Sequence, residues 1–428
     1  MLHVFQMLVD GRMSRIALLF IKLALRCGAF GKRLVEHLVA QAEQSEATAV
    51  LILAYGTMLN AGAGDAQVMR RLADLSLRSG DVVGANSLYT KLNSMGVERS
   101  TKLYKNALMN EALAKQGEPY IACLWSVIVD GTYGCVYDGD KVYVRELSDM
   151  NLGKLPYVAN RVSPGFTHFA CSVPEPVRTI RDPCLLLGVD GRNFAHWLSR
   201  RLLSLYLLEQ KNVPASMPIL INSDIRPYQY EYLDLLEISR SRLIPVEAYS
   251  TVQCAQLHVP ITFRRHPKMR VAIDWLRGRL AKYMVPPKQA TEKLYISRLD
   301  AKQRILLNEA ELEQRLVSLG FRPVVLDGMK VIDQIRTLSS ASIIVGPHGA
   351  GLSNIMFAPT TATVVEITNT KVAHMFDFRA IAEQLNQRYI DIVSGWFPDS
   401  QDPALGQQAD YLVDVEDVVL ALQDAELV

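Results

Sequence analysis

Residues 343–354 read IIVGPHGAGLSN, an apolar run followed by a glycine-rich turn that contains one histidine and leads into a polar helix start. The apolar run predicts a buried strand. Glycines have no Cβ, so they allow the backbone to adopt a positive φ and to approach a ligand closely. Free N–H groups at the start of a helix attract an anion through the helix dipole. The stretch therefore predicts a phosphate-binding turn.

The spacing in this turn excludes two common phosphate-binding motifs. It has no Gly-Lys-Ser/Thr, as a P-loop requires, and its glycines do not follow the Gly-x-Gly-x-x-Gly order of a dinucleotide fold. We therefore expect the turn to bind a nucleotide in another way.

Residues on both sides of the turn complete a longer pattern. GPHGAGLSN at 346–354, with Phe357-Ala358-Pro359 and VVEI at 364–367, closely resembles the signature of glycosyltransferase family 61. A second block, NFAHWL at 193–198, is similar to that family's Asn-aromatic-aromatic-His-Trp-Leu motif. The resemblance covers roughly residues 180–395. It also includes YISR at 295–298, Asp300, Arg304, Asn308, Glu309, Glu311, Leu312 and LGF at 319–321.

The composition limits the classes of partner and site. At 428 residues and 49% hydrophobic, the chain can build two or three domains. Its 46 basic and 44 acidic residues give no global field that favours nucleic acid. Six scattered cysteines without Cys-x-x-Cys, and no histidine cluster at zinc spacing, predict a reduced chain without a metal site. The sequence Asp138-Gly139-Asp140 is interpreted as a hairpin turn.

The first 35 residues carry a basic helical face. Two interpretations stay open: a solvated face of a helix packed on the core, or an amphipathic helix on an anionic membrane surface. Charges interrupt the apolar runs well short of the roughly 20 residues that a membrane span needs, so we expect neither a span nor a signal peptide. The expected location is the cytoplasm, or the inner face of the plasma membrane for the membrane interpretation. The basic residues are Arg12, Arg15, Lys22, Arg26 and Arg33.

Residues 1–126 are expected to form a helical accessory region. Within it, residues 74–88 align with residues 111–125 at an offset of 37, which suggests either a tetratricopeptide-like pair or an accessory helical cap. From residue 127 to 177 the pattern changes to short β-strands, so a domain boundary is predicted near residue 126.

The rest of the chain alternates between strands and helices, which predicts an α/β fold with helices on both faces of parallel sheets. The resemblance implies a GT-B type: two doubly wound, Rossmann-like domains facing a cleft. The acceptor side is then 127–287 and the donor side 288–428. The expected strands are 184–187, 219–222, 294–296, 321–326, 341–345 and 363–367; the expected helices are 194–210, 228–238, 269–284, 331–338, and one capped by Asn308 with Glu311 that ends at Gly320.

For the donor site, the resemblance implies metal-independent chemistry in which N–H groups and basic side chains stabilise the leaving diphosphate. Arg298 suits a bidentate contact with phosphate, or forms an ion pair with Asp300. His348 either donates to phosphate or bonds to the backbone of the turn. The expected nucleotide-binding groups are Arg298, Gly346, Gly349, Ala350, Gly351, Leu352, Asn354 and Glu366, with Asn354 capping or propping the short helix.

Two side chains carry further expectations. Glu366 either binds the ribose hydroxyls, as similar glutamates in GT-B folds do, or is a strand-end charge in water. His196 is the candidate general base, because an imidazole with a pKa near 6.5 accepts a proton at neutral pH. A core histidine is the alternative.

One departure from the family pattern concerns the acceptor side. The family places an acidic residue about four positions after this histidine and then Pro-Arg, whereas this chain has Arg200 and Arg201. Asp190 and Asp224 are candidates to replace that carboxylate.

The resemblance thus implies an inverting, metal-independent glycosyltransferase that uses a nucleotide diphosphate sugar, with a UDP-sugar as first choice. The acceptor would be a glycan or lipid-linked glycan of a bacterial surface or capsular polysaccharide. The N-terminal helices would contact a membrane or a protein partner, and no nucleic acid is expected. The alternatives are a sugar-nucleotide epimerase or hydrolase, and a catalytically silent scaffold.

Overall fold

The computed structural model describes residues 23–24, 35, 39–40, 42, 48–62, 64–97, 101–109, 118–144, 163–188, 193–261, 269–373, 375, 377–397 and 408–428. The chain forms two compact units. Unit 1 is Met1–Met109, Trp125–Arg181 and Glu247–Ala255; unit 2 is Asn110–Leu124, Asp182–Val246 and Gln256–Val428. The predicted basic face lies outside the described residues, as does Asp190. No helix in the described ranges is long and apolar enough to cross a membrane.

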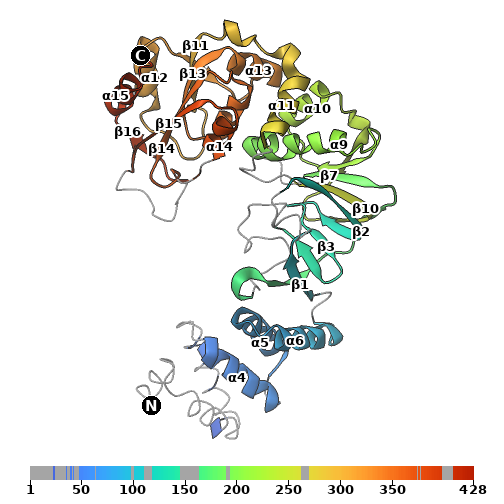
Figure 1. The fold of residues 1–428 in the computed structure, drawn as a ribbon. Helices are drawn as coiled ribbons and strands as arrows, with labels where there is room; N and C mark the ends of the chain where they lie inside the picture. Colours follow the sequence, from blue (N-terminus) through green and yellow to red (C-terminus); the bar gives the residue numbers. More distant parts are fainter. Residues whose placement is uncertain are drawn as a thin grey trace. The chain divides into compact units, whose positions relative to one another are not determined.

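Among the described residues, the helical part of unit 1 includes α4 (Thr48–Asn60), α5 (Ala66–Ser79) and α6 (Val82–Ser94) (Figure 1). Asp65 caps α5 by accepting a hydrogen bond from the Val68 N–H at 3.0 Å. Gly80 ends α5 with a φ of 90°, a conformation that favours glycine. Because the next helix is capped at once by Asp81, α5 and α6 form a tight hairpin, as the glycine break at residue 80 predicts.

A β-sheet follows the helices in unit 1. Its strands are β1 (Thr101–Ala107), β2 (Tyr120–Asp130, from Trp125), β3 (Val136–Asp138), β4 (Lys141–Tyr143), β5 (His168–Ser172), β6 (Arg178–Ile180) and β10 (Thr251–Ile261, to Ala255). Strands β3 and β4 pair antiparallel across Gly139, whose φ is 60°, so the predicted hairpin is confirmed. Leu103 of β1 packs in one core with Leu77 and Tyr89 of the helices.

The expectation of helix up to residue 126 is wrong for β1 and β2. It fails for the repeat as well, because residues 120–125 of the supposed second copy lie in a strand. The sequence of β2, YIACLWSVIVD, is rich in aromatic and β-branched residues, which pack well in a sheet. The alanine and leucine at its centre favour a helix only if the strand-forming residues around them are ignored.

Unit 2 contains a first parallel sheet, in the order β10-β7-β8-β9. The strands are β7 (Cys184–Gly188), β8 (Ile219–Asn222) and β9 (Leu243–Val246), with β10 from Gln256 onward. The predicted strands 184–187 and 219–222 are confirmed. Its helices are α8 (Phe194–His196), the π-helical turn η3 (Trp197–Leu202), α9 (Tyr206–Gln210), α10 (Pro227–Leu235) and α11 (Met269–Leu280).

The second sheet of unit 2 has the order β12-β11-β13-β14-β15-β16, parallel except for β16 (Figure 1). Its strands are β11 (Glu292–Ser297), β12 (Arg322–Val325), β13 (Ala341–Pro347), β14 (Thr363–Asn369), β15 (Arg388–Trp396) and β16 (Leu412–Val413). Its helices are α12 (Glu309–Ser318), α13 (Val331–Ser339), the 3-10 helix η7 (Ala350–Phe357), α14 (Asp377–Gln384) and α15 (Val415–Asp424).

Side-chain alternation along these strands produces two apolar layers. Ile344 and Val364 pack with α13, η7 and α14, while their neighbours Val345 and Val365 pack with α12 and α15. The first layer also contains Leu185 and Ile219 of the other sheet, so both sheets of unit 2 share one core. The mixed α/β class is confirmed, and the finer GT-B arrangement stays a prediction.

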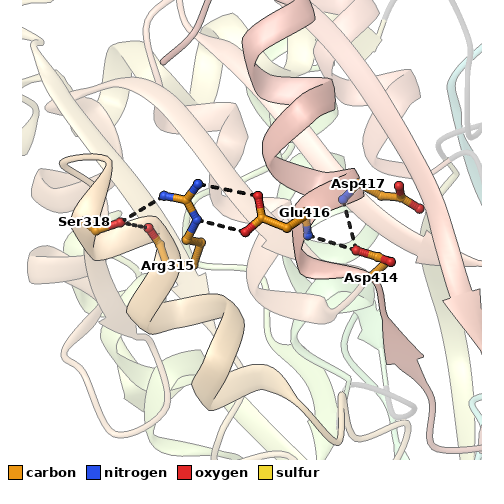
Figure 2. Close-up of polar contacts among 5 residues, drawn as sticks. All are labelled: Arg315, Ser318, Asp414, Glu416 and Asp417. Carbon is orange, nitrogen blue, oxygen red and sulfur yellow. Dashed lines mark hydrogen bonds and ion pairs between the residues drawn. The ribbon is translucent and has the colours of Figure 1, made fainter.

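The ends of α12 and α15 meet through polar side chains. Asn308 does not form the predicted capping box; its amide exchanges two hydrogen bonds with the Val413 backbone, at 2.8 and 3.2 Å. Asp414 caps α15 by accepting from the N–H groups of Glu416 and Asp417 (Figure 2). The Arg315 guanidinium on α12 makes two bonds to the Glu416 carboxylate. Strand β16 therefore fastens both helix starts to one edge.

Candidate active site

The glycine turn follows β13 directly. Among the described residues with positive φ, none belongs to this turn, and Gly349 is extended with a φ of −173°. The turn therefore does not use the positive φ that its glycines allow. The glycines serve close packing instead: a Cβ on Gly349 would lie 2.7 Å from Arg298 Nε, and one on Gly346 would lie 3.1 Å from Ile296 Cβ.

Arg298 follows β11 and lies across the turn. Its Nη1 donates to the His348 carbonyl at 2.8 Å, and its Nη2 donates to the Gln303 carbonyl at 3.3 Å. In the part of the chain that the structure describes, no ion pair joins Arg298 to Asp300. Strands β11 and β13 are parallel neighbours, so Arg298 and His348 lie at the same carboxyl edge, where ligands of such sheets bind.

His348 lies in a buried polar cluster with Glu366 and Tyr389. Its Nδ1 is 2.5 Å from Glu366 Oε1, and its side chain is 6% exposed. The Tyr389 hydroxyl donates to the other carboxylate oxygen of Glu366. The His348 ring also lies 5.1 Å from the Phe378 ring, so it has the apolar cover that its glycine neighbours do not predict.

Glu366 does not lie at a strand end, because β14 continues to Asn369. Both of its carboxylate oxygens are taken by His348 and Tyr389. Burial and the Glu366 charge raise the pKa of Tyr389 far above its ordinary value, so Tyr389 stays protonated and donates. Arg379 stacks 5.1 Å from the Tyr389 ring and pairs with Asp391. The carboxylate therefore has a fixed orientation toward the imidazole.

A second buried carboxylate, Glu309, holds the backbone of Arg298. Its Oε1 accepts from the Tyr295 hydroxyl at 3.0 Å, from the Ser297 hydroxyl at 3.3 Å and from the Arg298 N–H. Burial raises the pKa of Glu309 above its ordinary value. Sequence reasoning did not assign a role to Glu309 or Tyr389. Glu309 could have been found from its position next to Asn308, because both belong to the residues that resemble the family pattern.

Residues after the turn are buried. The Leu352 N–H donates to the Gly349 carbonyl at 3.0 Å and is therefore engaged. The first N–H groups of a helix have no partner inside that helix, and in η7 these are the N–H groups of Ala350 and Gly351. Asn354 does not cap η7; its amide donates to Gln334 Oε1 at 3.1 Å and to the Gly351 carbonyl at 3.2 Å.

His196 lies on α8, which packs against η7 within unit 2. Asn193 caps α8 by accepting from the His196 N–H at 3.1 Å. Phe194 packs edge-on to Tyr228 at 5.1 Å and near Tyr232, which stacks on Phe357 of η7. The structure thus brings the two family blocks together through a chain of aromatic rings.

Arg201 and Asp224, which the sequence analysis named on the acceptor side, form other contacts. Arg201 follows in the π-helical turn, where its side chain lies against Gly188, whose φ is 143°. Asp224 forms an ion pair with Arg226 at 3.2 Å. In the described ranges, no three His, Cys, Asp or Glu side chains gather as metal ligands.

Comparison with known proteins finds a family that is similar to this part of the chain. Residues 194–365 match the family model described as Glycosyltransferase 61. The chain is 30% identical over 157 residues to the mouse EGF domain-specific O-linked N-acetylglucosamine transferase, which is 33% of this chain and 29% of that protein. It is 31% identical over 109 residues to the rice Alpha-1,3-arabinosyltransferase XAT2, which is 24% of this chain and 18% of that protein.

The matched segment includes the residues around which the site is built. The chain spans less than a third of the length of these relatives. His196, Arg298 and His348 all lie between the ends of the family match. Residues 194–365 are therefore similar to the glycosyltransferase 61 family.

Proposed function

We propose that this protein is an inverting, metal-independent glycosyltransferase that moves a sugar from a nucleotide diphosphate sugar to a hydroxyl acceptor. The observation that carries the proposal is the pair formed by Arg298 and His348. Both follow parallel neighbouring strands, and Arg298 donates to the His348 carbonyl. The pair lies within the segment that is similar to the glycosyltransferase 61 family.

Arg298 and His348 act on the donor. The half-buried guanidinium and the first N–H groups of η7 offer positive charge at one edge, where a leaving diphosphate gains negative charge. Glu366 fixes His348 through Nδ1 and thereby sets the direction of Nε2. With that geometry, a protonated imidazole donates from Nε2 to an oxygen of the diphosphate. A UDP-sugar is the first donor to test.

His196 acts on the acceptor. In one displacement, the acceptor oxygen attacks the anomeric carbon, its proton passes to His196, and the bond to the diphosphate oxygen breaks. This inverts the configuration at that carbon. The packing of α8 against η7 supports the assignment, because it brings the helix of His196 to the donor turn.

The acceptor class is proposed as a glycan or lipid-linked glycan, in polysaccharide biosynthesis. The relatives in mouse and rat are named for an EGF domain, and the relative in rice is named for arabinosyl transfer. These relatives are eukaryotic, so they give no support to the expected bacterial, capsular role or to the expected cytoplasmic location. Any hydroxyl acceptor carried by a glycan or a protein meets the chemistry of the site.

A catalytically silent scaffold remains the second candidate. It is favoured by one observation: Arg200 and Arg201 stand where the family pattern has an acidic residue followed by Pro-Arg. A sugar-nucleotide hydrolase or epimerase would need the donor site without an acceptor groove.

The test is release of free nucleotide from UDP-, GDP- and CMP-sugars by the full chain, with and without EDTA. We expect slow release from one donor, unchanged by EDTA. Arg298→Ala and His348→Ala should each reduce it by about 10²–10³-fold, the effect of removing one donor to a developing charge. The matched controls are Arg322→Ala, at an exposed ion pair, and His168→Ala, in unit 1; both should keep release. Nucleotide-sugar binding without release, even with added acceptors, would favour the scaffold.

A further inference from the structure

Unit 1 contains a groove of about 400 Å³ on its β-sheet, within the usual size range of small-molecule sites. Its lining includes residues two positions apart on three strands: Lys102 and Tyr104 on β1, Ser126 and Ile128 on β2, Gln253 and Ala255 on β10. Residues at i and i+2 of a strand point to the same face. The groove is therefore one face of the sheet.

The strand register supports this reading. Ile128 lies directly opposite Tyr137, and Gln253 lies directly opposite Thr179. Each member of these pairs lines the groove, as expected for cross-strand neighbours on one face. The other face of β1 is occupied, because Leu103 packs against α5 and α6. All of these residues belong to unit 1, and those of β1, β2, β3 and β6 lie outside the family match, whereas Gln253 of β10 lies inside it.

A local irregularity in β2 exposes Trp125, the residue directly before Ser126 of the groove lining. Ser126 has a φ of 56°, which is uncommon for a non-glycine residue. There the alternation is interrupted: Trp125 and Ser126 are both exposed, between the buried Leu124 and Val127. The Trp125 side chain is 62% exposed. Such interruptions in a strand re-aim side chains and occur near binding sites.

The chemistry of the lining identifies the ligand class. Lys102 is the one charged residue among the described residues that line the groove. Its ammonium donates to the Gly139 carbonyl at 2.5 Å. One engaged cation does not suit a polyphosphate or a nucleic acid, which need several. The lining includes no carboxylate that would attract a cation. What remains is a combination of hydroxyl, amide and aromatic groups from Ser126, Thr179, Gln253 and Tyr104.

We propose that this groove binds a short neutral saccharide, independently of the donor site. The apolar face of a pyranose stacks on the exposed Trp125 indole, and its hydroxyls exchange hydrogen bonds with Ser126, Thr179 and Gln253. The inference goes beyond the proposed transfer reaction, because it assigns a non-catalytic saccharide site to unit 1.

The test is titration of the full chain with cellotetraose, xylotetraose, chitotetraose and maltotetraose, followed by calorimetry and tryptophan fluorescence. We expect saturable binding of at least one of them. Trp125→Ala and Gln253→Ala should each weaken it by about tenfold, the scale of one aromatic contact or hydrogen bond. The matched control is Trp396→Ala, since Trp396 is 56% exposed in unit 2; it should bind as the wild type does.

Two outcomes would overturn the proposal. One is that none of the four saccharides binds saturably. The other is that Trp125→Ala and Gln253→Ala, shown to be folded by circular dichroism, both bind as tightly as the wild type. Arg298→Ala should retain full saccharide binding, so failure of the transferase assay and failure of this proposal are separate results.

Discussion

Gly349 has no side chain, and this leaves space for the side chain of Arg298. A methyl group there would lie 2.7 Å from Arg298 Nε and 2.8 Å from its Cδ. We expect Gly349→Ala to fold normally, because an extended backbone suits any residue, and to displace the guanidinium from the His348 carbonyl. Nucleotide release should fall about 10²-fold, as for other misplacements of about 1 Å.

The control is Gly278→Ala in the helix α11, where an added Cβ meets nothing within 4 Å. It should leave release unchanged and stabilise the protein by about 0.5–1 kcal/mol. Equal activity of Gly349→Ala and wild type would contradict the role assigned to the close contact. The assay is the release measurement beside a thermal melt.

Glu309 predicts a pH dependence of stability. Its pKa is raised in the folded state, so between about pH 4.5 and the folded pKa the folded protein binds more protons than the unfolded chain. The stability that this group contributes is therefore present below about pH 4.5 and is lost as pH rises. Glu309→Gln cannot ionise, so its Tm should improve relative to wild type between pH 4.5 and 7. A constant difference in Tm across that range would contradict the assignment.

Local sequence singled out Arg298 and His348, which directly follow β11 and β13, and Glu366, which lies within β14. The sequence did not show that Glu366 binds His348 Nδ1. That contact depends on the register between β13 and β14, which places Gly346 beside Glu366. Tyr389 was missed for the same reason. It comes from β15, 23 residues further on, and is opposite Val364 in the ladder. A contact across strands is a property of pairing, which a single motif does not contain.

At the scale of elements, the start of α15 depends on one carboxylate. Asp414 accepts hydrogen bonds from the N–H groups of Glu416 and Asp417 at 2.9 and 3.2 Å (Figure 2). Asp414→Ala should cost about 1 kcal/mol of unfolding free energy, and Asp414→Asn much less, because asparagine also caps. The measurement is urea denaturation followed by circular dichroism.

The neighbouring ion pair provides the comparison. Glu416 is 66% exposed and Arg315 is 37% exposed, so Glu416→Ala should cost less than about 1 kcal/mol. A larger loss for Glu416→Ala than for Asp414→Ala would contradict this ranking of cap and surface pair.

Elements of unit 2 were predictable because strand and helix alternate there with clear periodicity, as in β8 and α13. Unit 1 was less predictable. Strands β1 and β2 come after the alanine- and leucine-rich helices α4 and α5 in the sequence, and they pair with β4, β5 and β3. The partners of β1 are distant in sequence, whereas β2 pairs with the nearby β3 and contains aromatic and β-branched residues that favour a strand.

At the scale of the whole molecule, the two units have separate apolar cores. Leu77 lies in the core of unit 1 with Tyr89, and Leu312 lies in unit 2 with Tyr295. We expect calorimetry to resolve two unfolding transitions. Leu77→Ala and Leu312→Ala should each shift a different transition to lower temperature. The loss of a buried leucine should reduce the free energy of unfolding of that unit by about 2–5 kcal/mol. A single transition that both substitutions lower equally would contradict independent cores.

The order of the segments along the chain has a consequence for synthesis on the ribosome. Unit 1 needs residues 247–255, which emerge after residues 182–246 of unit 2, and unit 2 needs residues 110–124, which emerge early. Neither unit can therefore be complete before a part of the other has been translated. A gene truncated between residues 109 and 182 would encode no full unit, and unit 2 cannot be isolated by cutting the chain at one position.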